Sequence, residues 1–283
     1  MTKILITGGA GQLGQAFAAY AHSQAERQGL ELAVLTRSLL DITSTASIRK
    51  SLSHYQPDLV INAAAYTDVE RAETEREKAY AVNAEGAALL AKQCAAYGAD
   101  LMQISTDYVF DGTKGAAYEV GDQVNPLNTY GQSKLAGEVA VLQVYPRAII
   151  IRTAWLYSEF ANNFQTKILN AAKTGRTLSV VDDQWGTPTE ANDLVRFLLN
   201  LSGDLRPYRG RIMHFAGAQL MSRWELAKVI IAAAYERGEL VALPRIEAAK
   251  TDSLRSLAQR PLNSALKNTL LDSDGAQPGG GDQ

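Results

Sequence analysis

The sequence has a single cysteine, Cys94, among its 283 residues. One cysteine cannot form an internal disulfide or a cysteine-rich metal site. The three histidines stand alone at scattered positions, so no metal site is expected. Apolar runs are short, and none approaches the roughly 20 residues that a membrane-spanning helix needs. The N-terminal apolar run leads directly into glycines and lacks the long apolar core of a signal peptide, so we expect a cytoplasmic protein.

An excess of charge of either sign is absent as well. Lysine and arginine total 28, and aspartate and glutamate total 30, which gives a formal net charge of −2. This balance provides no basic surface of the kind that binds nucleic acid or an anionic membrane, so neither partner is expected. Hydrophobic residues make up 46% of the chain, which is enough for a folded core. The length corresponds to about two domains.

Short runs of β-branched and aliphatic residues alternate with longer helical patterns through the first two-thirds of the chain. This alternation is typical of a doubly wound α/β fold, in which helices cover both faces of a parallel sheet. We therefore expect a Rossmann-like architecture. The predicted strands cover residues 3–7, 30–36, 58–63, 101–105 and 148–153, and the main predicted helices cover 79–97 and 130–144.

A glycine-rich loop follows the first predicted strand. Gly8, Gly11 and Gly14 are spaced three residues apart and, with Gln12 and Leu13, precede a helical pattern. Glycine permits a tight turn and a close approach to a pyrophosphate, and the helix N-terminus then favours the anion. These five residues are therefore candidates for dinucleotide binding. The alternative is an ordinary glycine-rich turn, which the position directly after the first strand disfavours.

The end of the second predicted strand bears on the choice of nicotinamide cofactor. An NAD site usually has an acidic residue about 20 residues beyond the glycines, where it bonds the ribose 2′-hydroxyl. Residues 35–38 (LTRS) contain no acid here, whereas the guanidinium of Arg37 matches the geometry of a 2′-phosphate. We expect NADPH as the cofactor, with NADH as the less favoured substitute. The alternative is that Arg37 is a solvated loop residue.

Tyr130 and Lys134 are four residues apart, on one face of a predicted helix. A Tyr-x-x-x-Lys match is common by chance, but this helix follows Thr106, at the carboxyl end of the fourth predicted strand, where open α/β sheets bind ligands. Reduction of a ketone requires a proton for the oxygen as hydride reaches the carbon. We therefore assign Tyr130 as the proton donor. Lys134 would lower the pKa of that phenol, and the Thr106 hydroxyl would polarise the carbonyl.

Longer motifs establish a resemblance that covers most of the chain. The most specific are residues 105–112 (STDYVFDG) and 182–189 (DDQWGTPT), supported by residues 57–67 (PDLVINAAAYT) and 151–157 (IRTAWLY). On these motifs the sequence resembles the extended short-chain dehydrogenase/reductases and, within them, the dTDP-4-dehydrorhamnose reductases. The resemblance implies NAD(P)H-dependent reduction of the C4 ketone of a dTDP-linked 4-keto-6-deoxy sugar, dTDP-4-dehydro-L-rhamnose, for cell-surface polysaccharide.

The resemblance also implies positions for cofactor and substrate. Tyr130 and Lys134 are expected to contact the cofactor as well. The other expected cofactor residues are Asp41 and Ile42, near adenine, and Ala63, Ala64, Ala65 and Tyr66, which line the cofactor. The positions near the sugar are matched by Thr67, Asp107, Phe110 and Trp155, and those that flank the nucleotide-sugar cleft by Asn163, Gln184 and Arg260. Arg260 is expected to meet the diphosphate, and Trp155 to pack on one face of the deoxysugar.

These assignments divide the expected fold into three parts. Residues 1–155 form the expected NADP(H)-binding Rossmann domain. Residues 156–271 form a smaller, mixed α/β substrate-binding lobe, with chain crossings allowed between the two. Residues 272–283 contain four glycines and a proline and are expected to be a disordered tail.

The sequence departs from related proteins at positions that bear on function. Tyr108 stands where related nucleotide-sugar dehydratases have a glutamate base, which favours reduction over elimination. Gln15 and Ala16 stand where some reductases have a magnesium-binding glutamate in a dimer contact, so we expect no metal and a monomer or a weak homodimer. Two alternatives stay open: a reductase or epimerase of another nucleotide-linked 4-ketosugar, and a non-catalytic NADP-binding regulatory subunit, in which the catalytic set would be damaged.

Overall fold

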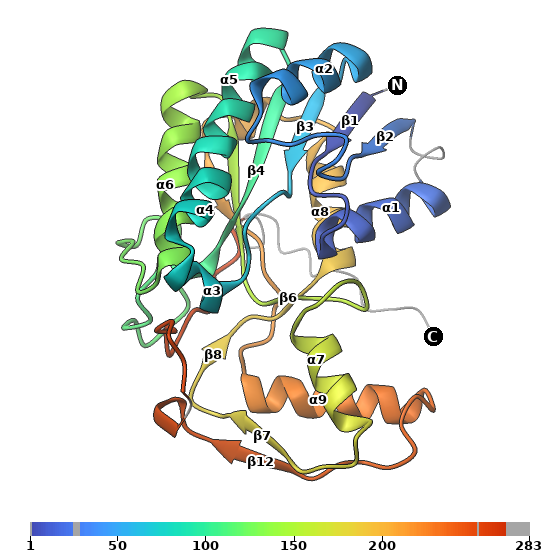
Figure 1. The fold of residues 1–283 in the computed structure, drawn as a ribbon, viewed down its shortest axis with the longest axis vertical. Coiled ribbons are helices and arrows are strands. Elements are labelled where there is room, and N and C mark those ends of the chain that lie inside the picture. Colours follow the sequence, from blue (N-terminus) through green and yellow to red (C-terminus); the bar gives the residue numbers. More distant parts are fainter. Residues whose placement is uncertain (1, 25–28, 254, 270–283) are drawn as a thin grey trace.

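The computed structural model describes residues 2–24, 29–253 and 255–269 (Figure 1). Residues 272–283, which we expect to form a tail, lie outside the described residues. A six-stranded sheet with its helices forms the upper part of the molecule in Figure 1, and a smaller group of helices and short strands lies below it. No helix within the described ranges is both long and apolar enough to cross a bilayer.

All neighbouring strands of the large sheet are parallel, in the order β10-β5-β4-β3-β1-β2. Parallel strands that are covered on both faces need continuous apolar runs, and every residue of β5 is buried. The strand order reverses between β1 and β3, which is where doubly wound sheets bind ligands. The prediction of a doubly wound, Rossmann-like fold is confirmed. The strands are β1 (Thr2–Ile6), β2 (Leu30–Val34), β3 (Leu59–Asn62), β4 (Asp100–Thr106), β5 (Ile149–Thr153) and β10 (Ile212–His214).

Helices cover both faces of this sheet because successive strand residues point to opposite sides. One face is covered by α1 (Gln12–Gln24) and α8 (Ala191–Leu201), and the other by α2 (Thr45–Tyr55), α5 (Ala87–Tyr97) and α6 (Thr129–Val144). Ile4 and Ile6 of β1 pack toward the first pair of helices. Leu5, between them, packs toward the other three, where the single cysteine Cys94 is a buried core residue.

A π-helical turn interrupts the predicted helix over residues 79–97. After β3 the chain forms α3 (Val69–Thr74) and α4 (Arg76–Tyr80), and the π-helical turn over Ala81–Gly86 then leads into α5. This turn places the Asn83 carbonyl against α6, where a Cβ added to Gly137 would lie only 2.0 Å from that oxygen. Position 137 on α6 therefore requires glycine. The Asn83 side chain bonds to Tyr66, in the segment that follows β3.

The smaller group, here called the small lobe, covers residues 156–190 and 221–253. Helices α7 (Phe164–Ala172) and α9 (Arg223–Glu236) pack on the parallel pair β7 (Leu178–Val181) and β12 (Ile246–Ala249). The short paired strands are β6 (Leu156–Tyr157) with β9 (Thr189–Glu190), and β8 (Trp185–Gly186) with β11 (Met221–Ser222). The chain crosses between the two parts, because α8 and β10 return to the large sheet before β11 begins.

Candidate active site

The glycine loop joins β1 to α1 at the reversal of strand order. Gly8 has a φ of +69°, and a Cβ added there would lie 2.8 Å from the Ala63 carbonyl carbon. A Cβ added to Gly14 would lie 2.4 Å from the Gly8 carbonyl oxygen, so both positions require glycine. Gly11 is exposed, and the side-chain oxygen of Gln12 is buried without a hydrogen-bond partner among the described residues. An exposed glycine at a helix N-terminus fits a pyrophosphate, whereas the Gln12 oxygen is an acceptor and does not itself bind an anion.

Arg37 and Asp41 lie in the loop after β2. Arg37 Nε lies 3.1 Å from Asp41 Oδ2, and the Arg37 side chain is 78% exposed. The Thr43 hydroxyl donates to Asp41 Oδ1 (2.7 Å) and holds the pKa of that carboxyl below its usual range, and Arg37 acts in the same direction. Exposed ion pairs are weak, so Arg37 is available to bind a phosphate. Ile42 is buried in the core below this loop.

Side chains from other elements hold the cofactor-lining segment after β3. The Thr7 hydroxyl accepts from Ala64 N (3.0 Å). Asn83, in the π-helical turn, accepts from Tyr66 N (2.8 Å) and donates to the Tyr66 carbonyl (3.0 Å). The Asn83 amide also donates to Ser133 Oγ (2.9 Å), which ties the segment to α6. Asn83 is thus a positioning residue that the sequence analysis did not identify.

The structure brings Thr106 and Tyr130 together at the carboxyl end of β4. Asn128 caps α6 by accepting from Gly131 N (2.8 Å), which places Tyr130 in the first turn of the helix. A Cβ added to Gly131 would lie 2.2 Å from the Tyr108 carbonyl oxygen, so this turn packs directly on the chain that follows β4. The rings of Tyr108 and Tyr130 meet edge to face, with centroids 6.0 Å apart.

The protonation states of Tyr130 and Lys134 follow from burial. Burial raises the pKa of the Tyr130 phenol, a hydrogen bond with Thr106 opposes this effect, and Asp107 adds to it. Lys134 is buried, its Nζ donates to the Ile104 carbonyl (2.7 Å), and burial lowers its pKa to about 8. Lys134 is not among the groups that shift the Tyr130 pKa, so the predicted lowering of that pKa is not found. Tyr130 therefore keeps its proton at neutral pH, as a proton donor must.

Asp107 and Arg223 extend this group into the small lobe. The Thr106 hydroxyl donates to Asp107 Oδ1 (3.0 Å), while Oδ2 is buried without a partner among the described residues. Burial raises the pKa of Asp107 to about 6, against the opposing effects of Ser264, Thr106 and the charge of Arg223. Tyr108 and Asp107 in turn raise the pKa of Arg223, the first residue of α9, against burial. Arg223 belongs to no motif that the sequence analysis identified.

Trp155 is held in a strained and tightly packed position. Its φ of +47° is unusual for a large side chain, and its Nε1 donates to Ser264 Oγ (3.1 Å). A Cβ added to Gly186 would lie 2.4 Å from the indole, and the Arg223 guanidinium lies 3.5 Å from the ring centroid. The indole thus has Gly186 and Arg223 as close neighbours. The expected contact with a sugar face is not available where Arg223 covers the ring.

Two other residues expected near the nucleotide-sugar cleft, Arg260 and Gln184, lie close to Arg223. Arg260 Nη2 lies 2.6 Å from Glu70 Oε1, and the charge of Arg260 acts on Arg223. The carbonyl of Gln184 accepts from Arg223 N (3.1 Å), whereas its buried side chain donates to the Thr251 hydroxyl (3.1 Å). Arg260 is therefore paired with Glu70 beside Arg223, and Gln184 positions the start of α9.

Three expected substrate residues are placed differently. Phe110 is completely buried and stacks on Tyr118, so the expected contact of its side chain with the sugar is wrong. Asn163 caps α7, where its side chain accepts from Thr166 N and donates to two main-chain carbonyls. Thr67 is exposed beyond the end of β3.

In the described part of the chain, no three His, Cys, Asp or Glu side chains gather as metal ligands would.

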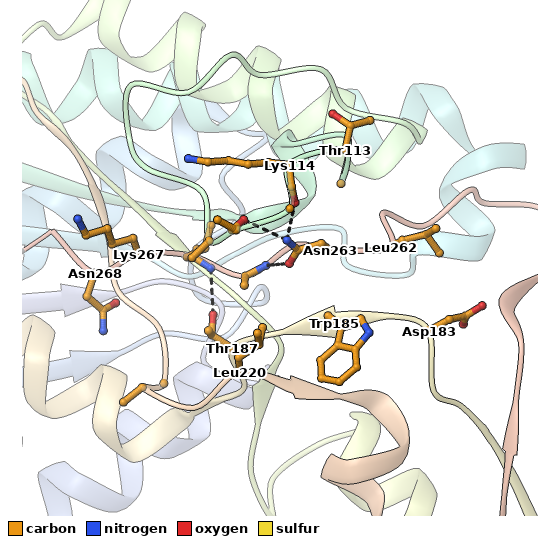
Figure 2. Close-up of a pocket in the computed structure, with 18 residues that line it drawn as sticks. Thr113, Lys114, Asp183, Trp185, Thr187, Leu220, Leu262, Asn263, Lys267 and Asn268 are labelled. Carbon is orange, nitrogen blue, oxygen red and sulfur yellow. Dashed lines mark hydrogen bonds between the residues drawn. The ribbon is translucent and has the colours of Figure 1, made fainter.

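A separate cavity of about 740 Å³ lies beside β8 (Figure 2). Trp185 lines it, whereas the next residue, Gly186, contacts Trp155, so β8 separates the cavity from the group around Arg223. The amide of Asn263 bonds to nearby main-chain carbonyls. Asn268 accepts from Ala216 N (2.6 Å) and donates to the Ala216 carbonyl (2.8 Å). None of the predicted catalytic residues lines this cavity.

The fold and the site together define a class of protein. A glycine loop at the strand reversal, with a threonine at the end of β4 and a tyrosine and lysine on α6, is the arrangement of dinucleotide-binding proteins of the short-chain dehydrogenase/reductase type. The family model described as RmlD substrate binding domain matches residues 1–279. The chain belongs to this family.

Relatives with established names match over most of the chain. The dTDP-4-dehydrorhamnose reductase of Aggregatibacter actinomycetemcomitans is 36% identical over 274 residues, which are 96% of this chain and 92% of that protein. The enzyme of the same name from Mycobacterium tuberculosis H37Rv is 44% identical over 234 residues, which are 81% of this chain and 74% of that protein. The crystal structure of the Bacillus anthracis dTDP-4-dehydrorhamnose reductase in complex with NADP is 32% identical, has a TM-score of 0.87, and matches 97% of this chain and 94% of that one.

Proposed function

We propose that this protein uses NADPH to reduce the C4 ketone of dTDP-4-dehydro-L-rhamnose, a dTDP-linked 4-keto-6-deoxy sugar, to dTDP-L-rhamnose. The main support is the meeting of Thr106 and a protonated Tyr130 at the carboxyl end of β4. The activity for which the matched relatives are named supports the same substrate, and the NADP in the Bacillus anthracis structure supports the cofactor.

NADPH, when bound, supplies the hydride that reduces the ketone carbon. In this proposal the glycine loop binds the pyrophosphate, and the loop that contains Arg37 and Asp41 binds the adenosine end. The main-chain segment held by Asn83 lines the nicotinamide side. The large sheet and its helices thus hold the cofactor, and the small lobe holds most of the substrate.

The side chains after β4 then complete the reduction. Tyr130 donates its phenolic proton to the carbonyl oxygen as negative charge develops there. The Thr106 hydroxyl, which donates to Asp107 in the structure, would turn its hydrogen to the carbonyl oxygen and stabilise that charge. Lys134, whose Nζ the Ile104 carbonyl holds one helical turn beyond Tyr130, is the buried cation that would bond the nicotinamide ribose. Tyr108 provides no carboxylate at the position of the dehydratase base, which favours reduction over elimination.

The test is steady-state oxidation of NADPH by the purified protein with dTDP-4-dehydro-L-rhamnose. We expect turnover with formation of dTDP-L-rhamnose. Binding of NADPH without turnover would instead favour a regulatory subunit. Turnover restricted to another nucleotide-linked 4-ketosugar would favour the third candidate, a reductase or epimerase of different specificity.

The substitution Arg37→Gln is expected to reduce the preference for NADPH over NADH by about 10- to 100-fold, because a 2′-phosphate loses a charge-assisted contact. The measurement is kcat/KM with each cofactor. Arg245→Gln is the matched control, since Arg245 is a similarly exposed arginine (77%) that pairs with Glu247 in the small lobe. An unchanged cofactor ratio in the Arg37 variant would eliminate the 2′-phosphate assignment.

A further inference from the structure

Arg223 is a cation without a carboxylate partner at the edge of the proposed active site. It is half-buried, and none of the carboxylates that the structure describes forms an ion pair with it. Burial lowers the pKa of its guanidinium and the charge of Arg260 acts in the same direction, whereas Tyr108 and the charge of Asp107, which lies beyond ion-pair distance, oppose this effect. Arg152, which is fully buried, has by contrast a bidentate carboxylate partner. A half-buried charge without an ion-pair partner is unfavourable, and groups in such environments concentrate at functional sites.

The position of the guanidinium is fixed by aromatic rings. It lies 3.5 Å from the Trp155 ring centroid and 5.1 Å from that of Phe164. Trp155 is itself held by the hydrogen bond to Ser264 and by close packing on Gly186. Stacking on an aromatic face leaves the edge of a guanidinium, with its N–H donors, available to a ligand.

The start of α9 adds to the positive potential at this point. Ser222 and Glu225 form a capping box that fixes the first turn of α9, and Arg223 is the first residue inside it. A cation at a helix N-terminus opposes the helix dipole, whereas an anion there is favoured by the dipole and the guanidinium together. Arg260 brings a second cation to the same place, but Glu70 partly neutralises it. Arg223 feels the charge of Asp107 but forms no ion pair with any described carboxylate, so it is the less neutralised of the two cations.

The location of Arg223 relative to Tyr130 fits the shape of the substrate. Tyr108 interacts with both residues, since its ring contacts Tyr130 edge to face and it raises the pKa of the Arg223 guanidinium against burial. In a pyranose, C4 and the anomeric carbon C1 lie on opposite sides of the ring. A sugar whose C4 oxygen meets Tyr130 would therefore direct the diphosphate on C1 away from Tyr130 by about the width of one ring.

We propose that Arg223 binds the diphosphate of the nucleotide-linked substrate, with Arg260 as the second cation. This inference rests on the proposed function and adds a residue outside the family motifs as the main anchor of the anionic group. Arg223 is a substrate-binding residue in this proposal and takes no part in proton transfer.

The test measures binding of dTDP and of thymidine by calorimetry, and steady-state kinetics, for wild type, Arg223→Gln and Arg223→Lys. We expect Arg223→Gln to weaken dTDP binding and raise the KM for the sugar nucleotide about 10- to 100-fold, with kcat within about threefold of wild type. Thymidine binding should not change, because thymidine has no diphosphate. Arg223→Lys should recover part of the loss, since it keeps the charge but not the bidentate geometry.

Lys228→Gln is the matched control. Lys228 lies on the same helix and places its Nζ 4.2 Å from the Trp224 ring centroid, outside the group around Tyr130. It should leave the dTDP affinity and the KM unchanged. A purely structural role of Arg223 would lower the melting temperature while dTDP binding stayed normal, and normal dTDP binding by Arg223→Gln overturns the inference. If wild type binds dTDP through Arg223 but reduces no ketosugar, the proposed function fails and the diphosphate site stands.

Discussion

Replacing Tyr130 with phenylalanine is expected to lower kcat by about 10²- to 10⁴-fold, because the reaction loses its proton donor. NADPH should still bind, since the glycine loop and the loop after β2 are untouched. The phenylalanine ring keeps the edge-to-face contact with Tyr108, so the free energy of unfolding should change little. Steady-state kinetics, fluorescence titration with NADPH and thermal unfolding measure the three quantities.

Tyr145→Phe is the control for this substitution. Tyr145 is a buried tyrosine of the large sheet's core, and its hydroxyl donates to the Ala99 carbonyl (3.1 Å) far from the proposed site. Its loss should cost about 1 kcal/mol of stability and leave kcat unchanged. If Tyr130→Phe retained kcat within about threefold of wild type, the proton would have to come from another group. Asp107, whose pKa is raised to about 6, would then be the first candidate.

The large sheet could be predicted from the sequence because each of its main strands is a local apolar run bounded by turn residues. Strand β10 was not predicted, because a run of three residues is too short to show the alternation of apolar and polar residues that indicates a strand. Helix α2 was also not predicted, although Ser44 caps it by accepting from Ser47 N, a signal that the sequence does contain. Strand β12 pairs only with β7 in the small lobe, a contact between segments far apart in the chain.

The candidate site could be predicted only where motifs fix the backbone. Residue spacing placed Lys134 on the same helix face as Tyr130, but it could not show that the flexible end of Lys134 bonds to the Ile104 carbonyl. A motif also does not distinguish an inward from an outward side chain, so Phe110 was expected at the sugar and instead lies in the core. Arg223 comes from a distant segment, and only the tertiary fold places it beside Trp155.

A buried ion pair behind Lys134 is expected to have the largest effect on stability. Glu138 and Arg152 are only 2% and 3% exposed, and their two hydrogen bonds measure 2.9 and 2.7 Å. Glu138→Ala would leave the Arg152 charge buried without a partner, which should cost about 3–5 kcal/mol in urea unfolding. The control is Asp100→Asn, which breaks a more exposed pair with Arg209 and should cost less than about 1 kcal/mol.

The double variant Glu138→Leu with Arg152→Met separates stability from chemistry. Removing both charges together should recover most of the lost stability, since no buried charge is left unpaired. The charge of Glu138 holds the pKa of Lys134 up against burial, which lowers it to about 8. Without Glu138 that pKa falls further, so Lys134 loses its proton at lower pH.

In the proposed reaction, activity depends on the cationic form of Lys134, which is lost as the pH rises through its pKa. For wild type, kcat/KM should therefore fall as the pH rises through about 8. In the double variant the same fall should begin at lower pH, measured from about pH 6 to about pH 9. If the double variant is stable and its kcat/KM falls at the same pH as that of wild type, Glu138 does not control the pKa of Lys134. Glu138 would then serve only to hold α6 on β5, and the cation of Lys134 would depend on other groups.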